Sequence, residues 1–134
     1  MKSKAALAPG LKARIEKVVP HEWTIAQYNP ALPAVFSTPA MIGMMEVAAA
    51  RAIQPVLPEG AISVGTRIEV DHLKAVPEGT LVHASAKLTA IRGRFLEFAV
   101  EARAGRHVIG RGKVFRAVVE PRKFHDKASK RKSS

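Results

Sequence analysis

The chain has 134 residues, 47% of them hydrophobic, and it carries a formal net charge of +11 without a single cysteine. This length and composition predict one globular domain with a real core rather than a disordered chain. The lack of cysteine excludes disulfides, thiolate metal ligands and a cysteine nucleophile.

The positive charge is concentrated at the C-terminal end of the chain. Residues 122–134 hold seven basic residues, with His125 counted among them, and one acid. This distribution predicts a single domain over residues 1–121, followed by a flexible basic tail over residues 122–134. We find no secretory signal, and the longest weakly polar stretch, residues 39–50, is too short to span a bilayer. We therefore expect a cytoplasmic protein without membrane insertion.

The first third of the chain predicts a strand and then an irregular segment. Residues 11–19 alternate apolar and polar side chains, which is typical of a half-buried strand. Residues 20–37 combine three prolines with Trp23, Tyr28 and Phe36. Proline interrupts regular structure while aromatic side chains favour burial, so we expect a loop that packs as a lid.

A helix is predicted to follow, beginning at Thr38 and ending near Ile53. Thr38 is a favourable N-cap and Pro39 a favourable first helical residue. The helix should end before Pro55. Apolar residues occupy every side of it, which indicates a helix enclosed by other structure.

Four strands are predicted in the remainder of the chain, at residues 61–73, 80–91, 95–104 and 107–119. Short glycine-containing turns join the last three strands, so these must be antiparallel to their neighbours. We expect an α+β fold in which a five-stranded antiparallel sheet, its last four strands forming a meander, curls around one central helix.

Glu46 is the residue within this helix that most invites a chemical interpretation. It is a lone carboxylate among apolar neighbours, and Arg51 lies outside the usual reach of a helical ion pair. When ionised in such surroundings it would be a strong base or nucleophile. Two structural alternatives remain open: Glu46 reaches solvent, or it pairs with a cation from a strand.

Thr38 and His72 are the two residues that can complete a reaction site. Thr38 opens the helix, where free backbone N–H groups can hold an oxyanion, and His72 ends a predicted strand. Thr38 and Glu46 are eight residues apart, roughly 12 Å along the helix axis. They cannot meet within one helix, so a shared site predicts a symmetric dimer. The histidines lack metal-ligand spacing, and we expect neither a metal nor a separate cofactor.

These features resemble those of hot-dog-fold acyl-CoA thioesterases, in particular the fluoroacetyl-CoA thioesterase-like family. The resemblance covers roughly residues 12–124, and it is carried by TPAMIGMMEVAAARA at 38–52, VGTRIEVDHLKAVPEGT at 64–80 and AIRGRFLEFAVEA at 90–102. It implies a hot-dog homodimer, possibly assembled further, that hydrolyses an acyl thioester without a metal.

The resemblance also implies roles for individual residues. Thr38, Glu46 and His72 match the family's catalytic residues, and Gly65 matches a backbone position that contacts the substrate carbonyl. Glu46 would attack the thioester carbonyl or activate water, and His72 would pass a proton to the departing thiolate. The candidate contacts to the phosphates of coenzyme A are Arg92, Arg94, Lys113, Arg116 and Arg122.

Other functions remain open at this point. A hydratase or dehydratase of the same fold would need an adjacent acid and histidine, and Asp71 precedes His72; however, neighbouring strand residues point to opposite faces. A non-catalytic acyl-CoA-binding protein is a second alternative. Nucleic-acid binding through the basic tail is the third, and it is disfavoured because the sequence has no recognition-helix signature.

Overall fold

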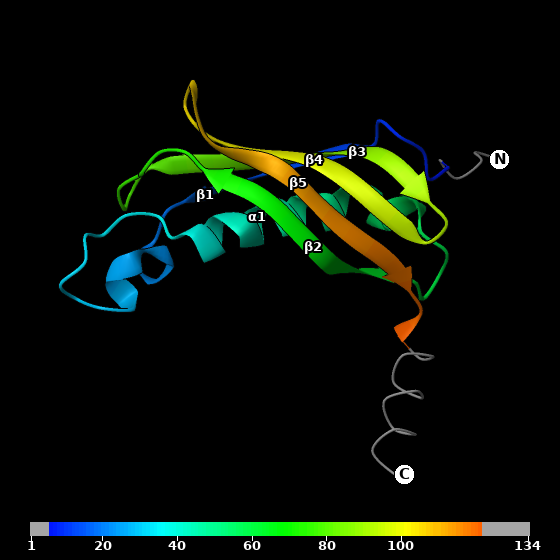
Figure 1. Ribbon diagram of the computed structural model, residues 1–134, viewed down its shortest axis with the longest axis horizontal. Coiled ribbons are helices and arrows are strands. Elements are labelled where there is room, and N and C mark those ends of the chain that lie inside the picture. Colours follow the sequence, from blue (N-terminus) through cyan, green and yellow to red (C-terminus); the bar gives the residue numbers. More distant parts are fainter. Residues whose placement is uncertain (1–5, 122–134) are drawn as a thin grey trace, which may run out of the picture.

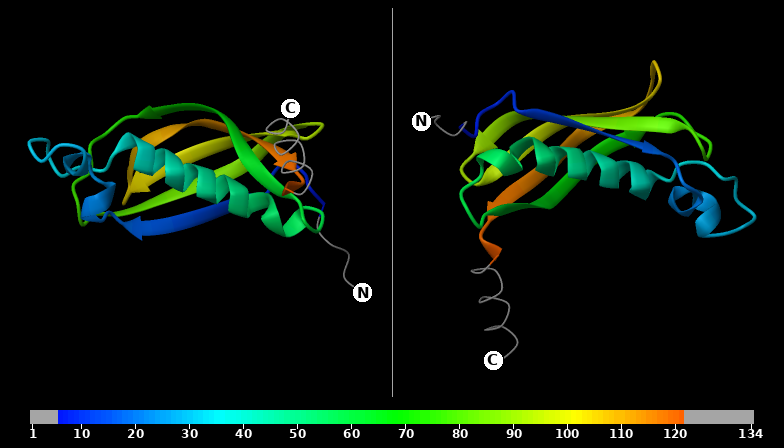
Figure 2. Two further views of the ribbon diagram at one scale, coloured as in Figure 1. Left: turned by 90° about the horizontal axis from the view of Figure 1, so that it is seen from below. Right: turned by 180° about the vertical axis from the view of Figure 1, so that it is seen from behind.

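The computed structural model describes residues 6–121, which form a curved antiparallel sheet with one long helix against its concave face (Figures 1 and 2). In chain order the elements are β1 (Lys12–Val18), η1 (His21–Trp23), η2 (Ile25–Gln27), α1 (Thr38–Ile53), η3 (Gln54–Val56), β2 (Ile62–His72), β3 (Leu81–Arg92), β4 (Phe95–Ala104) and β5 (His107–Val119). The strand order is β1-β3-β4-β5-β2, and each neighbouring pair is antiparallel. The predicted five strands and central helix are confirmed.

The position of β2 differs from the predicted meander. Strands β3, β4 and β5 follow one another through tight turns, but β2 pairs with β5 at the edge of the sheet and not with β3. The connection from β2 to β3 is longer than a tight turn and packs as structure of its own. Val76 within it is buried, and Pro77 pairs with Val35. This connection therefore carries the chain across the fold to the far side of the sheet.

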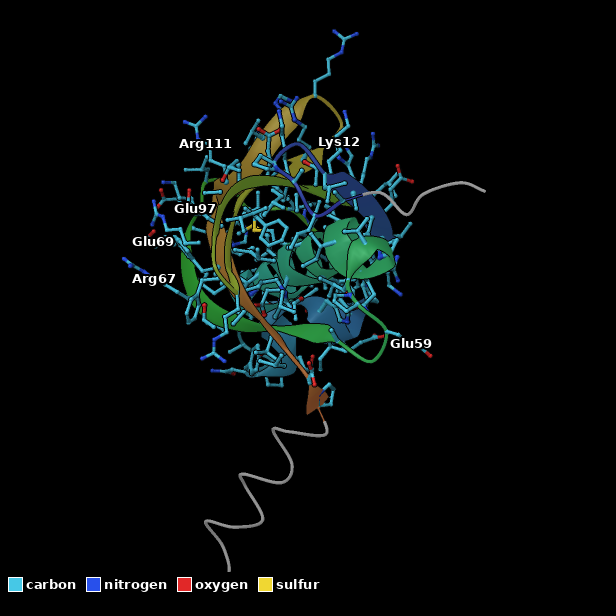
Figure 3. The ribbon with its side chains drawn as sticks, turned by 90° about the vertical axis from the view of Figure 1, so that its right-hand side faces the viewer. Lys12, Glu59, Arg67, Glu69, Glu97 and Arg111 are labelled. Atoms are coloured by element: carbon cyan, nitrogen blue, oxygen red, sulfur yellow. The ribbon has the colours of Figure 1, made fainter. Side chains whose placement is uncertain are left out.

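The core lies between α1 and the concave face of the sheet. Met41, Met45, Leu88, Phe98 and Ile109 are fully buried there. Alternate residues of the strands point outward instead, and Figure 3 shows charged side chains on this outer face. The sheet thus has one apolar face for the helix and one polar face.

The helix is not enclosed on every side, contrary to the prediction from its composition. Gly43 is exposed, and 43% of Val47 is accessible to solvent. The sheet covers one side of α1 only, because five strands curl around the helix without closing into a barrel (Figure 2). The open side borders a cavity of about 590 Å³ beside Trp23 and Tyr28.

The segment before the helix is more ordered than a simple loop. It contains the short helices η1 and η2, and an isolated bridge joins Thr24 to Phe36. Its aromatic residues differ in environment: Phe36 is buried in the core, whereas 68% of Tyr28 is exposed. The predicted burial of aromatics is therefore correct for Phe36 and wrong for Tyr28.

Candidate active site

The start of α1 shows that two neighbouring hydroxyl residues have different tasks. Ser37, not Thr38, is the N-cap: its side chain accepts a hydrogen bond from the Ala40 N–H at 3.2 Å. The predicted capping role of Thr38 is therefore wrong, because the extended conformation required of a cap falls one residue earlier. Thr38 is the first residue of the helix, and its hydroxyl is available for another partner.

That partner is His72. The Thr38 Oγ1 and His72 Nδ1 atoms share a hydrogen bond of 2.8 Å, although the residues are 34 positions apart in the sequence. The imidazole also meets the edge of the Phe36 ring, with centroids 6.3 Å apart. Both residues line a cavity of about 300 Å³ whose other walls are mainly apolar: Ile25, Val35, Phe36, Leu73, Lys74 and Ala75.

The environment of His72 keeps the imidazole neutral at pH 7. Burial lowers the pKa of His72 from its ordinary value of 6.5, and the nearby polar backbone of Lys74 opposes this effect in part. The Nε2 atom is buried and has no hydrogen-bond partner among residues 6–121. A neutral imidazole with one unused nitrogen can accept or deliver a proton there.

Glu46 lies about two helical turns after Thr38 in α1, and its side chain contacts the sheet. Its carboxylate is 3.4 Å from Nη1 of Arg116, and its side chain is 34% exposed. Arg116 is buried and also donates to the Ser63 hydroxyl at 2.8 Å and to the Ser63 carbonyl at 2.9 Å. Of the two structural alternatives for Glu46, the structure therefore shows pairing with a cation from a strand. That cation, Arg116 of β5, contacts both Glu46 of α1 and Ser63 of β2.

Gly65 of β2 faces the same carboxylate. A Cβ atom placed on Gly65 would overlap the Oε1 atom of Glu46, so only glycine leaves room for the carboxylate in this position. The pairing of β2 with β5 also shifts register between Gly65 and Arg67. The carboxylate therefore lies against exposed backbone at a bulge in an edge strand.

The structure brings the predicted site residues together in two groups rather than one. Thr38 and His72 form the first group, and Glu46, Gly65 and Arg116 form the second. Eight residues of helix separate Thr38 from Glu46, roughly 12 Å along the axis. The two groups therefore do not meet within one protomer.

The candidate phosphate contacts also differ in their surroundings. Arg92, the last residue of β3, and Arg94, in the turn between β3 and β4, are both exposed. Lys113 is exposed and lies 3.8 Å from a carboxylate oxygen of Glu97. Arg116 is buried beside Glu46, an arrangement that does not favour contact with a phosphate in solvent. Arg122 lies outside the described residues.

Asp71 and His72 point to opposite faces of the sheet, as strand geometry predicts. His72 lines the cavity beside Thr38, whereas Asp71 lines a depression next to Arg111 and Ser85. These two residues are therefore not arranged as the paired acid and histidine of a hydratase.

Sequence reasoning missed Ser37, Ser63 and the role of Arg116. The pair Ser37-Thr38 offers two possible caps, and only the backbone conformation decides between them. Arg116 is 70 residues from Glu46, so no local pattern connects the two.

The described part of the chain contains no group of side chains arranged to bind a metal ion and no helix suited to crossing a membrane. Over residues 6–121, no three acidic or histidine side chains are placed to hold a metal ion. None of the helices in this range is long and apolar enough to cross a membrane.

Comparisons with known proteins agree with this architecture. A family model described as fluoroacetyl-CoA-specific thioesterase, FlK, matches residues 19–122. The fluoroacetyl-CoA thioesterase of Streptantibioticus cattleyicolor is 40% identical over 116 residues, which cover 82% of this chain and 84% of that protein. A solved structure of an FlK variant in complex with acetyl-CoA is 35% identical with a TM-score of 0.85, covering 93% of this chain and 98% of that one. A hot-dog-like protein from Thermanaerovibrio acidaminovorans is 26% identical with a TM-score of 0.84, covering 92% and 91%.

These findings confirm the fold and the activity expected from the sequence. The sheet curled around one helix is a hot-dog fold, and the activity is hydrolysis of acyl-CoA thioesters. The chain belongs to the FlK family of fluoroacetyl-CoA thioesterase-like enzymes.

Proposed function

We propose that the enzyme hydrolyses acyl-CoA at a site shared between two protomers, with Thr38 and His72 from one and Glu46 and Gly65 from the other. The observation that carries this proposal is the 2.8 Å hydrogen bond between Thr38 and His72, which leaves Glu46 about two helical turns away. A two-fold axis between antiparallel helices would place each pair opposite the other protomer's carboxylate.

Thr38 supplies the part of the site that stabilises the oxyanion. Among the first helical N–H groups, that of Ala40 is bonded to Ser37, and Pro39 has none. The N–H of Thr38 has no partner within the helix and lies beside its own hydroxyl. Together with the positive end of the helix, these groups would stabilise negative charge on the thioester carbonyl oxygen.

Glu46 begins the reaction in one of two ways. As a nucleophile, its carboxylate oxygen bonds to the carbonyl carbon, the C–S bond breaks, and water then hydrolyses the resulting anhydride. As a general base, it takes a proton from water while the water oxygen bonds to that carbon. In both cases His72 passes a proton to the departing thiolate and is reprotonated by the proton that the attacking water loses, so the products are a free acid and a thiol.

The cavity beside Thr38 and His72 fits the acyl group. Its walls are mainly the apolar side chains of Ile25, Val35 and Phe36, and its volume of about 300 Å³ is at the small end of ligand pockets. We infer that it receives a short acyl chain. Arg92, Arg94 and Lys113 remain our candidates for contacts with the phosphates of coenzyme A.

A symmetric homodimer is supported by the exposed apolar surface on the open side of the fold. Val47 and Gly43 are exposed on α1, and Ile62, Val64 and Ile68 are exposed on β2. Edge strands and apolar helix faces of this kind are commonly covered in oligomers. A cytoplasmic location stays a prediction.

The proposal is tested by substituting the proposed catalytic carboxylate. Glu46→Gln keeps the shape and removes the negative charge, so kcat should fall by about 10²-fold or more when thiol release is followed with a panel of acyl-CoA esters. Circular dichroism provides the folding control. A Glu46→Gln enzyme with near-normal kcat would show that the carboxylate is structural. Hydration of crotonyl-CoA without thiol release would instead favour the hydratase alternative.

A further inference from the structure

One residue of the cavity beside Thr38 and His72 does not match a purely apolar acyl group. Apart from these two residues, the walls of this cavity of about 300 Å³ are apolar except for Lys74. Burial lowers the pKa of His72, so the imidazole is neutral at pH 7 and Lys74 carries the full positive charge of these walls. A lysine ammonium has three donors and no acceptor, and it therefore favours an anionic group nearby.

The backbone that follows His72 determines where Lys74 lies. The N–H groups of Leu73 and Lys74 both donate to the carbonyl oxygen of Ile109, at 2.7 and 3.3 Å. Ile109 belongs to β5 and is fully buried in the core. Lys74 is therefore held two residues after His72, and its apolar stem can lie along the apolar walls while the ammonium group stays near solvent.

The acids near Lys74 in the sequence do not neutralise its charge. Asp71, three residues earlier, lines the depression beside Arg111 on the other face of the sheet. Glu78, four residues later, is hydrogen-bonded to His21 at 2.7 Å. In the described part of the chain no carboxylate lies within ion-pair distance of Lys74. Its charge is therefore available to a ligand.

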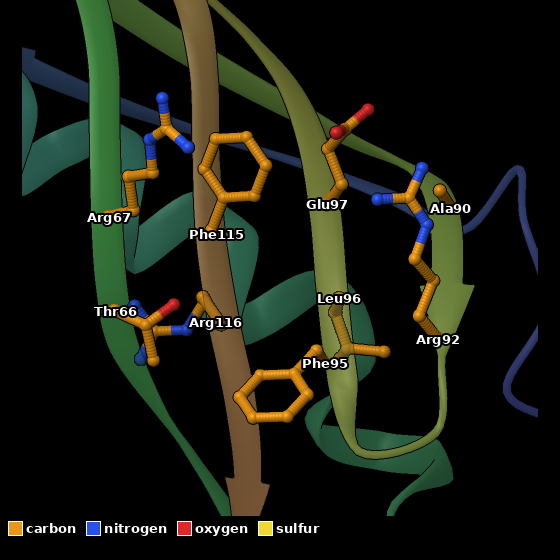
Figure 4. Close-up of a pocket in the computed structure, with 9 residues that line it drawn as sticks. All are labelled: Thr66, Arg67, Ala90, Arg92, Phe95, Leu96, Glu97, Phe115 and Arg116. Atoms are coloured by element: carbon orange, nitrogen blue, oxygen red, sulfur yellow. The ribbon is translucent and has the colours of Figure 1, made fainter.

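Three other cavities of the structure combine charges of both signs. A depression over β2, β3, β4 and β5 is lined by arginines together with Glu97 (Figure 4). The cavity beside Trp23 is lined by both Glu22 and Arg51, and the depression beside Asp71 likewise has acids among its cations. The cavity beside Thr38 and His72 differs from these, because it is lined by a cation and by no acid. This excess charge lies next to the reacting groups, so it bears on the choice of substrate.

The proposed dimer does not remove this excess charge. In the shared site the second protomer would bring its Glu46 opposite Thr38 and His72. Each Glu46 is accompanied by the Arg116 of its own chain, whose Nη1 atom is 3.4 Å from the carboxylate. These two opposite charges offset each other, so the assembled site keeps the charge of Lys74.

We propose that Lys74 determines acyl specificity and that the preferred substrates are short acyl-CoA esters whose acyl group ends in a carboxylate, such as malonyl-CoA or succinyl-CoA. The thioester carbonyl lies at Thr38, and the distal carboxylate pairs with the Lys74 ammonium group. The apolar walls between them contact the methylene groups and strengthen the pairing, because they exclude water. The inference rests on the proposed function, since it takes this cavity as the site of the acyl group.

The experiment compares acyl-CoA substrates of the same shape and different charge. Malonyl-CoA is matched with isovaleryl-CoA, and succinyl-CoA with isocaproyl-CoA, because two methyl groups then replace the two carboxylate oxygens. Thiol release, corrected for spontaneous hydrolysis, gives kcat and KM for each substrate. The wild-type enzyme should favour at least one of the charged substrates over its match by about tenfold or more in kcat/KM.

Substitution of Lys74 tests the assignment directly. Lys74→Met should raise KM for the preferred charged substrate about tenfold and leave kcat unchanged, because the distal carboxylate keeps its charge throughout the reaction and is bound equally in the ground and transition states. KM for the uncharged match should not rise. Lys74→Arg keeps the charge and should keep the preference. Lys87→Met is the matched control, since Lys87 is an exposed lysine of β3 that lines the depression beside Asp71, and it should change neither constant.

A wild-type enzyme without preference for either charged substrate would overturn the assignment. Equal effects of Lys74→Met on both members of a pair, in KM or in kcat, would also overturn it, because Lys74 would then act in folding or in catalysis itself. A failure of the proposed function is distinguishable: the Glu46→Gln enzyme would remain active, while the preference for a charged acyl group would still be present in the wild type and lost in Lys74→Met.

Discussion

Mixing two inactive variants should restore activity if the site is shared across the two-fold axis. Thr38→Ala removes the hydroxyl beside His72, and Glu46→Gln removes the carboxylate, so each variant alone should lose about 10²-fold or more in kcat. The two positions lie roughly 12 Å apart in one helix. One protomer therefore cannot bring both groups to one carbonyl carbon.

The expected recovery of activity follows from the number of intact active sites in each kind of dimer. After unfolding and refolding of an equimolar mixture, about half of the dimers contain one copy of each variant. Each such dimer has one site with both substitutions and one site with neither. Thiol release should therefore reach about a quarter of the wild-type rate, whereas sites confined to one chain would give no recovery.

A matched control uses the double variant mixed with the wild type. In a shared site every mixed dimer is inactive, so about a quarter of all sites remain active; with sites confined to one chain about half remain. Native mass spectrometry confirms that mixed dimers have formed. Mixed dimers without recovery in the first experiment, or half activity in the second, would refute the crossed arrangement.

Four further predictions concern individual residues. Ser37→Ala should lower the free energy of unfolding by about 1 kcal/mol, measured by thermal denaturation, and leave kcat unchanged, because Ser37 caps the helix without reaching His72. Gly65→Ala should lower kcat/KM about tenfold or more with unchanged circular dichroism, since its methyl group would displace the Glu46 carboxylate. Because burial lowers the pKa of His72, kcat/KM should be constant near pH 7 and fall only at pH values under 6.5; an acid limb centred above 6.5 would contradict this. Arg116→Met should cost about 1–2 kcal/mol in urea denaturation, because it leaves Glu46, about a third exposed, and the Ser63 carbonyl without their partner.

Local sequence patterns were sufficient to predict the central helix and the strands, but not the order of the strands in the sheet. The alternation of residues 11–19 and the turn at Gly93 predicted β1 and the β3–β4 hairpin correctly, because these features depend on neighbours in sequence. The edge position of β2 depends on how residues 73–80 pack, which no periodicity encodes. Long-range packing therefore set the strand order.

The candidate site shows the same contrast between what local sequence predicts and what long-range packing decides. Glu46 and His72 were identifiable because each is a polar residue in an apolar or strand context. The hydrogen bond between Thr38 and His72 and the ion pair between Glu46 and Arg116 connect residues 34 and 70 positions apart. Such contacts form only once the sheet has wrapped the helix, so sequence could nominate the residues but not their partners.

The two adjacent hydroxyls at the head of α1 have a practical consequence for engineering. Because Ser37 caps the helix, residue 38 can be substituted to alter acyl preference or chemistry with little loss of folded protein. Libraries that randomise residue 38 while keeping serine before it should therefore yield mostly well-folded enzymes, whose differences report on catalysis alone.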